Sequence, residues 1–183
     1  MNNPLDPKTI SKFVNQLVIP PVLFPRTVWN PTTGEIISNN YIITMTEFKQ
    51  QILPEDFPKT TVWAYGGAIV DPSNCKNIIR FRNAPGATIE ATRGIPVNIQ
   101  WINNITSSHS LPVDPTLHWA DPNNLGMVMP DSVPPFPPGL PKAQAPVPVV
   151  PHLHGGENHS IFDGHPDAWR TKTQPYLFLQ IFN

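Results

Sequence analysis

Residues 97–103 read Val-Asn-Ile-Gln-Trp-Ile-Asn, and in this stretch Val97, Ile99 and Trp101 alternate with polar residues. Side chains two residues apart in a β-strand lie on the same face of the sheet. The stretch therefore predicts a strand with one buried face. The strand predicted from residue 97 extends to residue 105. Similar short runs of β-branched and aromatic residues, each bounded by turn residues, predict further strands at 41–48, 60–65, 77–81 and 87–91.

Proline accounts for 25 of the 183 residues, which is well above the usual ~5%. Proline lacks a backbone N–H and disfavours both helix interiors and central strand positions. We therefore expect an all-β chain: an incomplete antiparallel β-sandwich with Greek-key-like connections over residues 41–183. Within it, the proline-rich run at about 130–151 is interpreted as an extended surface loop.

The two ends of the sequence carry different signals. Asp6-Pro7 is typical of a helix start, and Ile10, Phe13, Val14 and Leu17 follow at helical spacing, so one short helix is expected in a wrapping segment, residues 1–40. Near the other end, a strand is expected through residues 149–154. The final apolar run, 176–182, needs a neighbouring strand, either from this chain or from another polypeptide.

Composition excludes several classes of protein. Lys and Arg total 12 against 13 acidic residues, and no basic stripe is present, so nucleic acid is not an expected partner. No apolar stretch approaches the ~20 residues that span a bilayer, and the first residues lack a secretory signal, which favours cytoplasmic synthesis. The single cysteine, Cys75, has no partner for a disulfide or a zinc motif and is interpreted as a half-buried apolar residue.

Histidine marks the candidate site, because four of the six histidines fall between residues 152 and 165. In the sequence His152-Leu153-His154-Gly155-Gly156, a strand would place both imidazoles on one face. Neutral imidazole suits copper, zinc, iron and nickel, so ligand type alone leaves the metal open. Two ordinary polar strand residues are the alternative interpretation.

The His-Leu-His-Gly-Gly segment is followed by Asp-Gly-His-Pro-Asp-Ala-Trp at 163–169. Together they resemble the first copper motif of bacterial multicopper oxidases, particularly the spore-coat laccases and their bilirubin-oxidase-like relatives. Further stretches agree in the same order, so the resemblance covers most of the chain: residues 12–14, 19–20, 41–47, 62–66, 85–90, 101–104 and 111–114.

This resemblance implies a cupredoxin-like first domain, with His152 as a ligand of the type 2 copper and His154 as a ligand of a type 3 copper. Asp163 matches an acidic residue near the oxygen-reducing cluster, so a proton relay is implied; accepting hydrogen bonds in its turn is the alternative. The implied activity is the four-electron reduction of dioxygen to water, coupled to one-electron oxidation of phenols, bilirubin-like pigments or metal ions.

Departures from the family pattern limit what these residues can do alone. The second His-x-His of the first domain, the cysteine-bearing type 1 site and the two carboxy-terminal His-x-His motifs are absent, and Cys75 does not match the copper-binding cysteine. We therefore expect a partner polypeptide that carries the remaining domains and ligands, with dioxygen and a small reducing substrate. Residues 1–183 alone are expected to be inactive. A spore-coat location follows from the resemblance only.

The other histidines receive no copper. His118 matches a histidine of the relatives that is not a ligand; His159 and His165 are expected on an exposed turn, and His109 is assigned no role. Two other functions stay open. One is a non-enzymatic coat or scaffold component, and the other is a cupin-type enzyme with one metal held by His152, His154 and Glu157.

Overall fold

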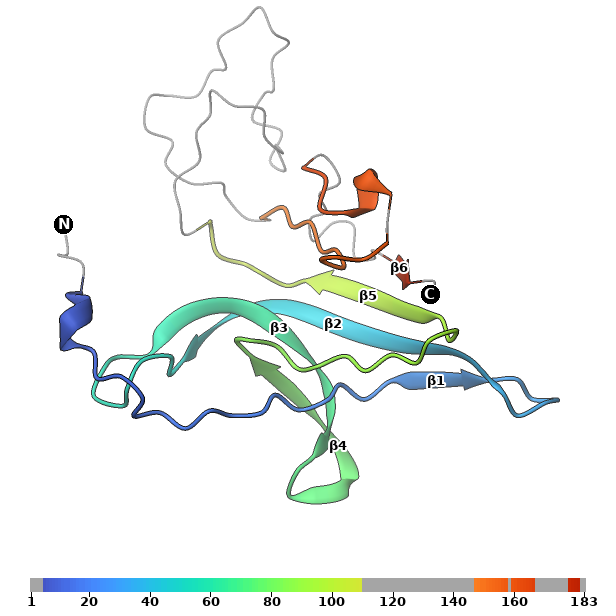
Figure 1. Cartoon of the computed structure of the whole chain (residues 1–183), viewed down its shortest axis with the longest axis horizontal. Helices are drawn as coiled ribbons and strands as arrows, with labels where there is room; N and C mark the ends of the chain where they lie inside the picture. The colour runs from blue at the N-terminus through green and yellow to red at the C-terminus, as the bar shows by residue number, and fades with distance from the viewer. Residues whose placement is uncertain (1–4, 110–146, 158, 167–177, 182–183) are drawn as a thin grey trace, which may run out of the picture.

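The structure is a computed structural model that describes residues 5–109, 147–157, 159–166 and 178–181. Its strands form one sheet in the order β4-β3-β2-β5-β6, and β1 also pairs with β2 (Figure 1). The predicted all-β class is confirmed, and the open sheet is consistent with an incomplete cupredoxin-like sandwich. The elements are η1 (Pro7–Thr9), β1 (Arg26–Trp29), β2 (Ile36–Gln50), β3 (Thr60–Asp71), β4 (Asn74–Asn83), β5 (Val97–Asn103), η2 (Ser160–Phe162) and β6 (Phe178–Ile181).

Four of the predicted strands are confirmed as β2, β3, β4 and β5, whereas the predicted strand at 87–91 is wrong. In that segment only Thr88 pairs, in an isolated bridge with Val22. One pairing also differs from the antiparallel expectation, because β2 and β5 run parallel, with Ile43 opposite Trp101. Parallel neighbours need a crossover connection. That connection includes β3 and β4, and residues 84–96 are its last part, which leads from β4 back to β5.

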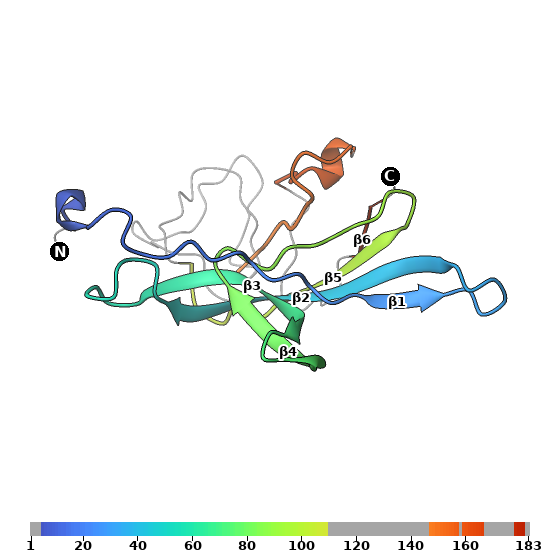
Figure 2. The ribbon, with the colours of Figure 1, turned by 60° about the horizontal axis from the view of Figure 1, so that its bottom comes forward.

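One face of the sheet carries the main core. Tyr41 and Ile43 of β2, Val97 and Ile99 of β5 and Ile69 of β3 are each at most 4% exposed, and Leu23 packs against them. The backbone N–H of Leu23 donates to the Thr88 carbonyl at 2.8 Å. The alternation read from residues 97–103 therefore places the buried face correctly. Figure 2 shows the segment before β1 running along the sheet.

The expected N-terminal helix is present only as the 3-10 helix η1. Asp6 caps it as expected, since its carboxylate accepts a hydrogen bond from the Lys8 N–H at 2.9 Å. Beyond Thr9 the chain is not helical: Phe13 has a φ of 60° and is fully exposed. The apolar series is therefore not a helical face. A helix this short is unstable unless another element packs against it, and η1 buries none of its residues.

Residues 149–154 do not form the expected strand. Val149 makes a single bridge, residues 150–153 are irregular, and His154 and Gly155 form a turn. Pro151 lacks the N–H that a central strand would need, and Gly155 has a φ of 77°, which ends extended backbone. The terminal run does form a strand: β6 pairs antiparallel with β5, so an earlier strand of the same chain is its partner.

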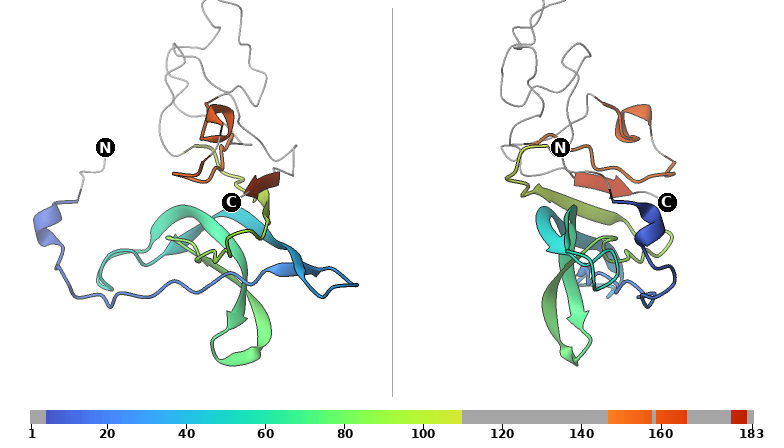
Figure 3. Two further views of the ribbon diagram at one scale, coloured as in Figure 1. Left: turned by 45° about the vertical axis from the view of Figure 1, so that its right-hand side comes forward. Right: turned by 90° about the vertical axis from the view of Figure 1, so that its left-hand side faces the viewer.

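Two expectations drawn from composition concern Cys75 and membrane-spanning helices. Cys75 is exposed in the β3–β4 hairpin, so the expectation of a half-buried residue is wrong. Hairpin turns lie at the surface because their backbone groups need water. Within the ranges that the structure describes, no helix is long and apolar enough to cross a membrane. Figure 3 shows that the β3–β4 hairpin projects away from the segment that carries His152 and His154.

Candidate metal centre

The segment that carries the two histidines is fastened to the sheet at Val147. Val147 is 2% exposed and packs with Met45 and Ile105. The side chain of Asn103, itself 5% exposed, donates from Nδ2 to the Val147 carbonyl at 2.6 Å. Its Oδ1 accepts from the Ile105 N–H at 3.2 Å. A buried amide with both ends bonded fixes Val147, and with it the start of this segment, beside the end of β5.

His152 is oriented by the backbone before it. Its Nδ1 lies 3.0 Å from the Val150 carbonyl oxygen, and the ring is half-buried. In the tautomer protonated at Nδ1, that nitrogen donates to the carbonyl and leaves a lone pair on Nε2. Metal-binding histidines are commonly oriented by such a hydrogen bond from the second ring nitrogen. With Nδ1 engaged by the Val150 carbonyl, Nε2 is the ring nitrogen of His152 that is left for a ligand.

His154 lies beside His152 at the start of the turn. The ring centroids are 5.9 Å apart, and the ring planes differ by 30°. His154 is exposed, and the turn that follows it is closed by a hydrogen bond from the Gly156 N–H to the Leu153 carbonyl at 3.2 Å. Although the two histidines are not in a strand, their rings lie side by side and outside a sealed core. Irregular backbone, and not the pleat of a strand, brings the two rings side by side.

The second half of the motif returns to His152 through Gly164. A Cβ built on Gly164 would lie 2.8 Å from Cε1 of His152 and 3.1 Å from both ring nitrogens. Gly164 also has a φ of 75°, which disfavours other residues. It follows Asp163, which is exposed and whose N–H donates to the Ser160 carbonyl at 3.2 Å at the end of η2. The structure thus brings Asp163-Gly164 next to His152.

Comparisons with known proteins found laccases and multicopper oxidases among the relatives of the chain. The chain is 31% identical to a laccase of Bacillus subtilis (strain 168) over 96% of its own length and 27% of the laccase. It is 33% identical to a laccase of Haloferax volcanii over 88% of its length, and 34% identical to a multicopper oxidase of Arabidopsis thaliana over 63%. These relatives support the multicopper oxidase family. The chain spans about a quarter or less of each of them. No family model matches the chain.

Copper is the cofactor that these multicopper oxidase homologues imply. The donor set suits it, because imidazole nitrogen is a good ligand for copper. The missing Cβ of Gly164 leaves the His152 ring room to hold its orientation. Among the described residues, no group of three His, Cys, Asp or Glu side chains could hold a metal ion. The pair supplies two imidazole nitrogens, which fits part of a copper site.

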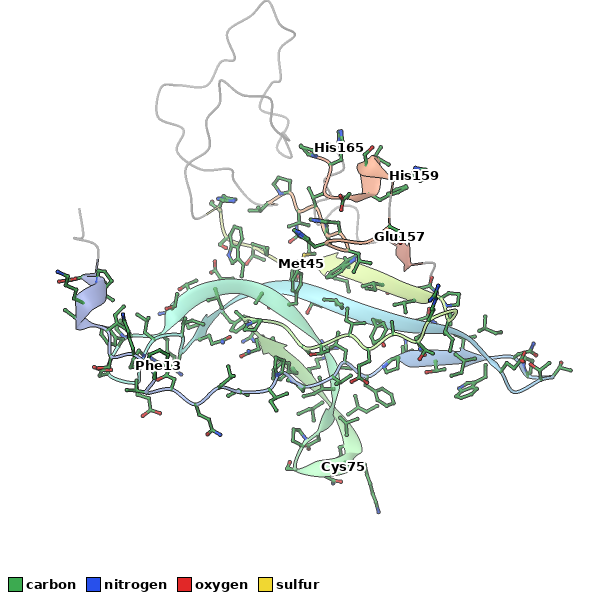
Figure 4. All side chains as sticks on the ribbon, in the orientation of Figure 1. Phe13, Met45, Cys75, Glu157, His159 and His165 are labelled. Carbon is green, nitrogen blue, oxygen red and sulfur yellow. The ribbon has the colours of Figure 1, made fainter. Side chains whose placement is uncertain are left out.

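The remaining candidates separate from the pair. Figure 4 places His159 and His165 on the same part of the chain as Glu157, and all three are exposed as expected for turn residues. Glu157 forms no third ligand with the pair in the part of the chain that is described, which removes the support for the cupin interpretation. His109 packs edge-on against Trp63, with centroids 5.3 Å apart. His118 lies outside the described residues.

A carboxylate network lies on the sheet near the anchored segment. Glu47 Oε2 accepts hydrogen bonds from Ser107 Oγ at 2.5 Å and from Trp63 Nε1 at 2.8 Å. The Ser107 bond first, and the Trp63 bond second, lower the pKa of Glu47 below its ordinary value. Glu47 is therefore held as a carboxylate that links β2 to β3 through Trp63 and to the segment after β5 through Ser107.

Sequence reasoning missed the residues that position the pair. Asn103 was noted only as part of a matching stretch, and Gly164 only as part of a motif. A signal for Gly164 existed, because glycine after an Asx residue is typical of a turn with positive φ. No sequence signal identifies Asn103, since its role depends on a contact with Val147, 44 residues away.

Proposed function

We propose that these residues are the amino-terminal part of a laccase-like multicopper oxidase, in which His152 binds the type 2 copper and His154 binds a type 3 copper. The observation that supports this most directly is the pair of neighbouring rings, 5.9 Å apart between centroids, with His152 oriented by a backbone carbonyl. Copper, when bound, supplies one-electron redox chemistry. The proposed reaction couples dioxygen reduction to water with oxidation of phenols, bilirubin-like pigments or metal ions.

In this proposal the protein orients the imidazole rings of His152 and His154 before copper binds. The Val150 carbonyl fixes the tautomer of His152, so that Nε2 is the ligand atom. Gly164 lies against the same ring and limits its rotation. His154 occupies a central position of the turn closed between Gly156 and Leu153, and its ring lies beside the ring of His152. Each contact reduces the side-chain freedom that copper binding would otherwise have to remove.

Asp163 is proposed as a proton relay. Reduction of one dioxygen to two waters consumes four protons and four electrons, so the site needs a route for protons. Asp163 is exposed to water and directly precedes Gly164, which lies close to the His152 ring. It can therefore take a proton from solvent at a carboxylate oxygen and release it towards the site. Asp163→Asn should slow turnover of the complete enzyme by about 10²-fold.

The remaining ligands are proposed to lie in a polypeptide that carries the other multicopper oxidase domains. Two imidazoles leave most copper coordination positions to water, so the pair by itself should bind copper weakly. The type 1 site that collects electrons from the reducing substrate would also belong to that polypeptide. A spore-coat location is part of the same proposal, and it rests on the resemblance alone.

The test compares residues 1–183 alone with an assembly that includes the remaining ligands. Both samples are loaded with copper, and oxidation of a phenolic substrate is followed under air. We expect no turnover from residues 1–183 and turnover from the assembly. His152→Ala and His154→Ala should each abolish that turnover, whereas the matched change His159→Ala, at an exposed histidine outside the pair, should leave it unchanged.

Copper content separates the alternatives. Loss of type 2 copper signal in the electron paramagnetic resonance spectrum of the His152→Ala assembly would support the assignment of that residue. Full activity from residues 1–183 alone would contradict the proposal, as would an unchanged copper spectrum in both variants. An assembly that binds no copper at all would instead favour a coat or scaffold component.

A further inference from the structure

The sheet carries a groove on the face opposite the core. In β2, Ile43 and Met45 are buried in the core, whereas Ile42, Thr44 and Thr46 line this groove. The groove has a volume of about 730 Å³ and draws residues from all strands between β1 and β5. Its lining contains three arginines and, within the described chain, no aspartate or glutamate. We call it the arginine groove and define it by Arg26, Arg80, Arg82, Thr44, Gly66 and Ile102.

Register explains the length of the groove. Arg82 lies opposite Gly66, Gly66 lies opposite Thr44, and Thr44 lies opposite Ile102, so one row crosses β4, β3, β2 and β5. Three interstrand spacings of about 4.8 Å make this row roughly 14 Å long, which is the span of about four extended residues. Arg80 lies two residues from Arg82 on the same face of β4, and Arg26 comes from β1.

Small residues keep the floor of the groove low. A Cβ on Gly66 would lie 3.0 Å from the Phe81 carbonyl oxygen and 3.1 Å from the Arg82 Cβ, so a larger residue does not fit without movement. Ala68, opposite Arg80, continues the low floor. Beside it, Ile42 and Ile78 are 42% and 53% exposed. The floor is therefore both open and apolar.

The arginines give the groove its charge. The Arg82 guanidinium lies 4.7 Å above the Phe48 ring centroid, which holds it in place. Among the described residues, no carboxylate forms an ion pair with Arg26, Arg80 or Arg82. Three uncompensated guanidinium groups around an apolar floor produce a local positive potential, although the whole sequence has a net charge of −1. Guanidinium groups bind carboxylates in a two-bond geometry.

We propose that the arginine groove binds an extended acidic peptide segment of another polypeptide. Its carboxylates would pair with Arg26, Arg80 and Arg82, and its apolar side chains would cover Ile42 and Ile102. The row across four strands suits a peptide better than a single small anion. The apolar floor favours a peptide over nucleic acid, because a phosphate backbone has no apolar side chains to place there. This interaction requires no copper.

The test uses residues 1–183 and two fluorescent peptides, one of alternating Leu and Glu and one of alternating Leu and Lys. Fluorescence anisotropy should detect binding of the acidic peptide only. The double variant Arg80→Gln, Arg82→Gln should weaken binding severalfold, up to about 25-fold, since each exposed ion pair contributes up to about fivefold. The matched variant Arg93→Gln removes the same charge from an exposed position outside the groove and should leave affinity unchanged.

Salt and thermal unfolding complete the experiment. Affinity should fall when sodium chloride is raised from about 20 mM to about 200 mM, because the contacts are screened. Equal binding of both peptides, or salt-independent binding, would overturn the proposal. So would unchanged affinity in the double variant. If that variant unfolds at a lower temperature, Arg80→Lys with Arg82→Lys provides the second comparison and should retain most of the affinity. Tighter binding of a single-stranded oligonucleotide than of the acidic peptide would contradict the proposal and indicate that the groove binds nucleic acid.

Discussion

Replacing Gly164 with alanine separates two physical effects at the candidate metal centre. The first is backbone strain, because Gly164 has a φ of 75°, and a left-handed conformation costs an alanine about 1–2 kcal/mol. The second is contact, because the new Cβ would lie 2.8 Å from Cε1 of His152. The ring must then move by several tenths of an ångström, which disturbs its 3.0 Å contact with the Val150 carbonyl. Losing that hydrogen bond adds about 1 kcal/mol.

Gly34 provides the matched control. It has a φ of 73°, but a Cβ there would meet nothing within 4 Å, so Gly34→Ala measures strain alone. We expect Gly164→Ala to lower the unfolding temperature by about 2–4 °C more than Gly34→Ala, which corresponds to about 1 kcal/mol for a domain of this size. Only Gly164→Ala should shift the His152 ring resonances in the nuclear magnetic resonance spectrum. Equal losses of stability together with unchanged ring resonances would refute the packing argument.

Three further changes test the rest of the fold. Asn103→Ala should cost about 1–3 kcal/mol in urea unfolding, because the buried Val147 carbonyl loses its donor; a loss below about 0.5 kcal/mol would contradict this role. Ile43→Ala, at 3% exposure, should cost about 2–5 kcal/mol, whereas Ile42→Ala, at 42% exposure on the other face, should cost far less. Glu47 has a lowered folded pKa, so its contribution is present above the unfolded value and lost as the pH falls through the folded one. Urea midpoints of the wild type and Glu47→Gln should therefore converge on acidification below 4.5, and a constant difference would argue against the Ser107 and Trp63 bonds.

The strands of the sheet could be predicted because their signal is local. In residues 97–103 the apolar residues face one side, and the structure buries Val97 and Ile99 as that alternation requires. The segment 149–154 also begins with β-branched valines, but in the described residues it forms no continuous strand pairing, and Pro151 lacks a backbone N–H donor. Residue type alone therefore does not distinguish a paired strand from an irregular segment that packs through Val147.

The neighbouring histidine rings of the candidate site could be predicted from the sequence, whereas the residues that hold them in place could not. The His152 and His154 pair is visible in the sequence as a motif, and their rings do lie together. Their placement depends on Asn103 and Gly164, which act through contacts between separate parts of the chain. The helix expected from Ile10 to Leu17 failed for a related reason, since spacing indicates a face but not whether another element covers it.

The parallel pairing of β2 with β5 has a consequence for the order in which the chain folds. The side chains of Asn40 and Asn98 hydrogen-bond across this pair at 2.8 Å, although 58 residues separate them. The β2, β3 and β4 pairings are more local and can close first, because loop closure is less costly for short separations. β5 can pair with β2 only once the long connection between them, which includes β3 and β4, has been closed. Pulsed hydrogen exchange should therefore protect the amides of β3 and β4 before those of β5, and the histidine segment, tied to β5 through Asn103, should become ordered last.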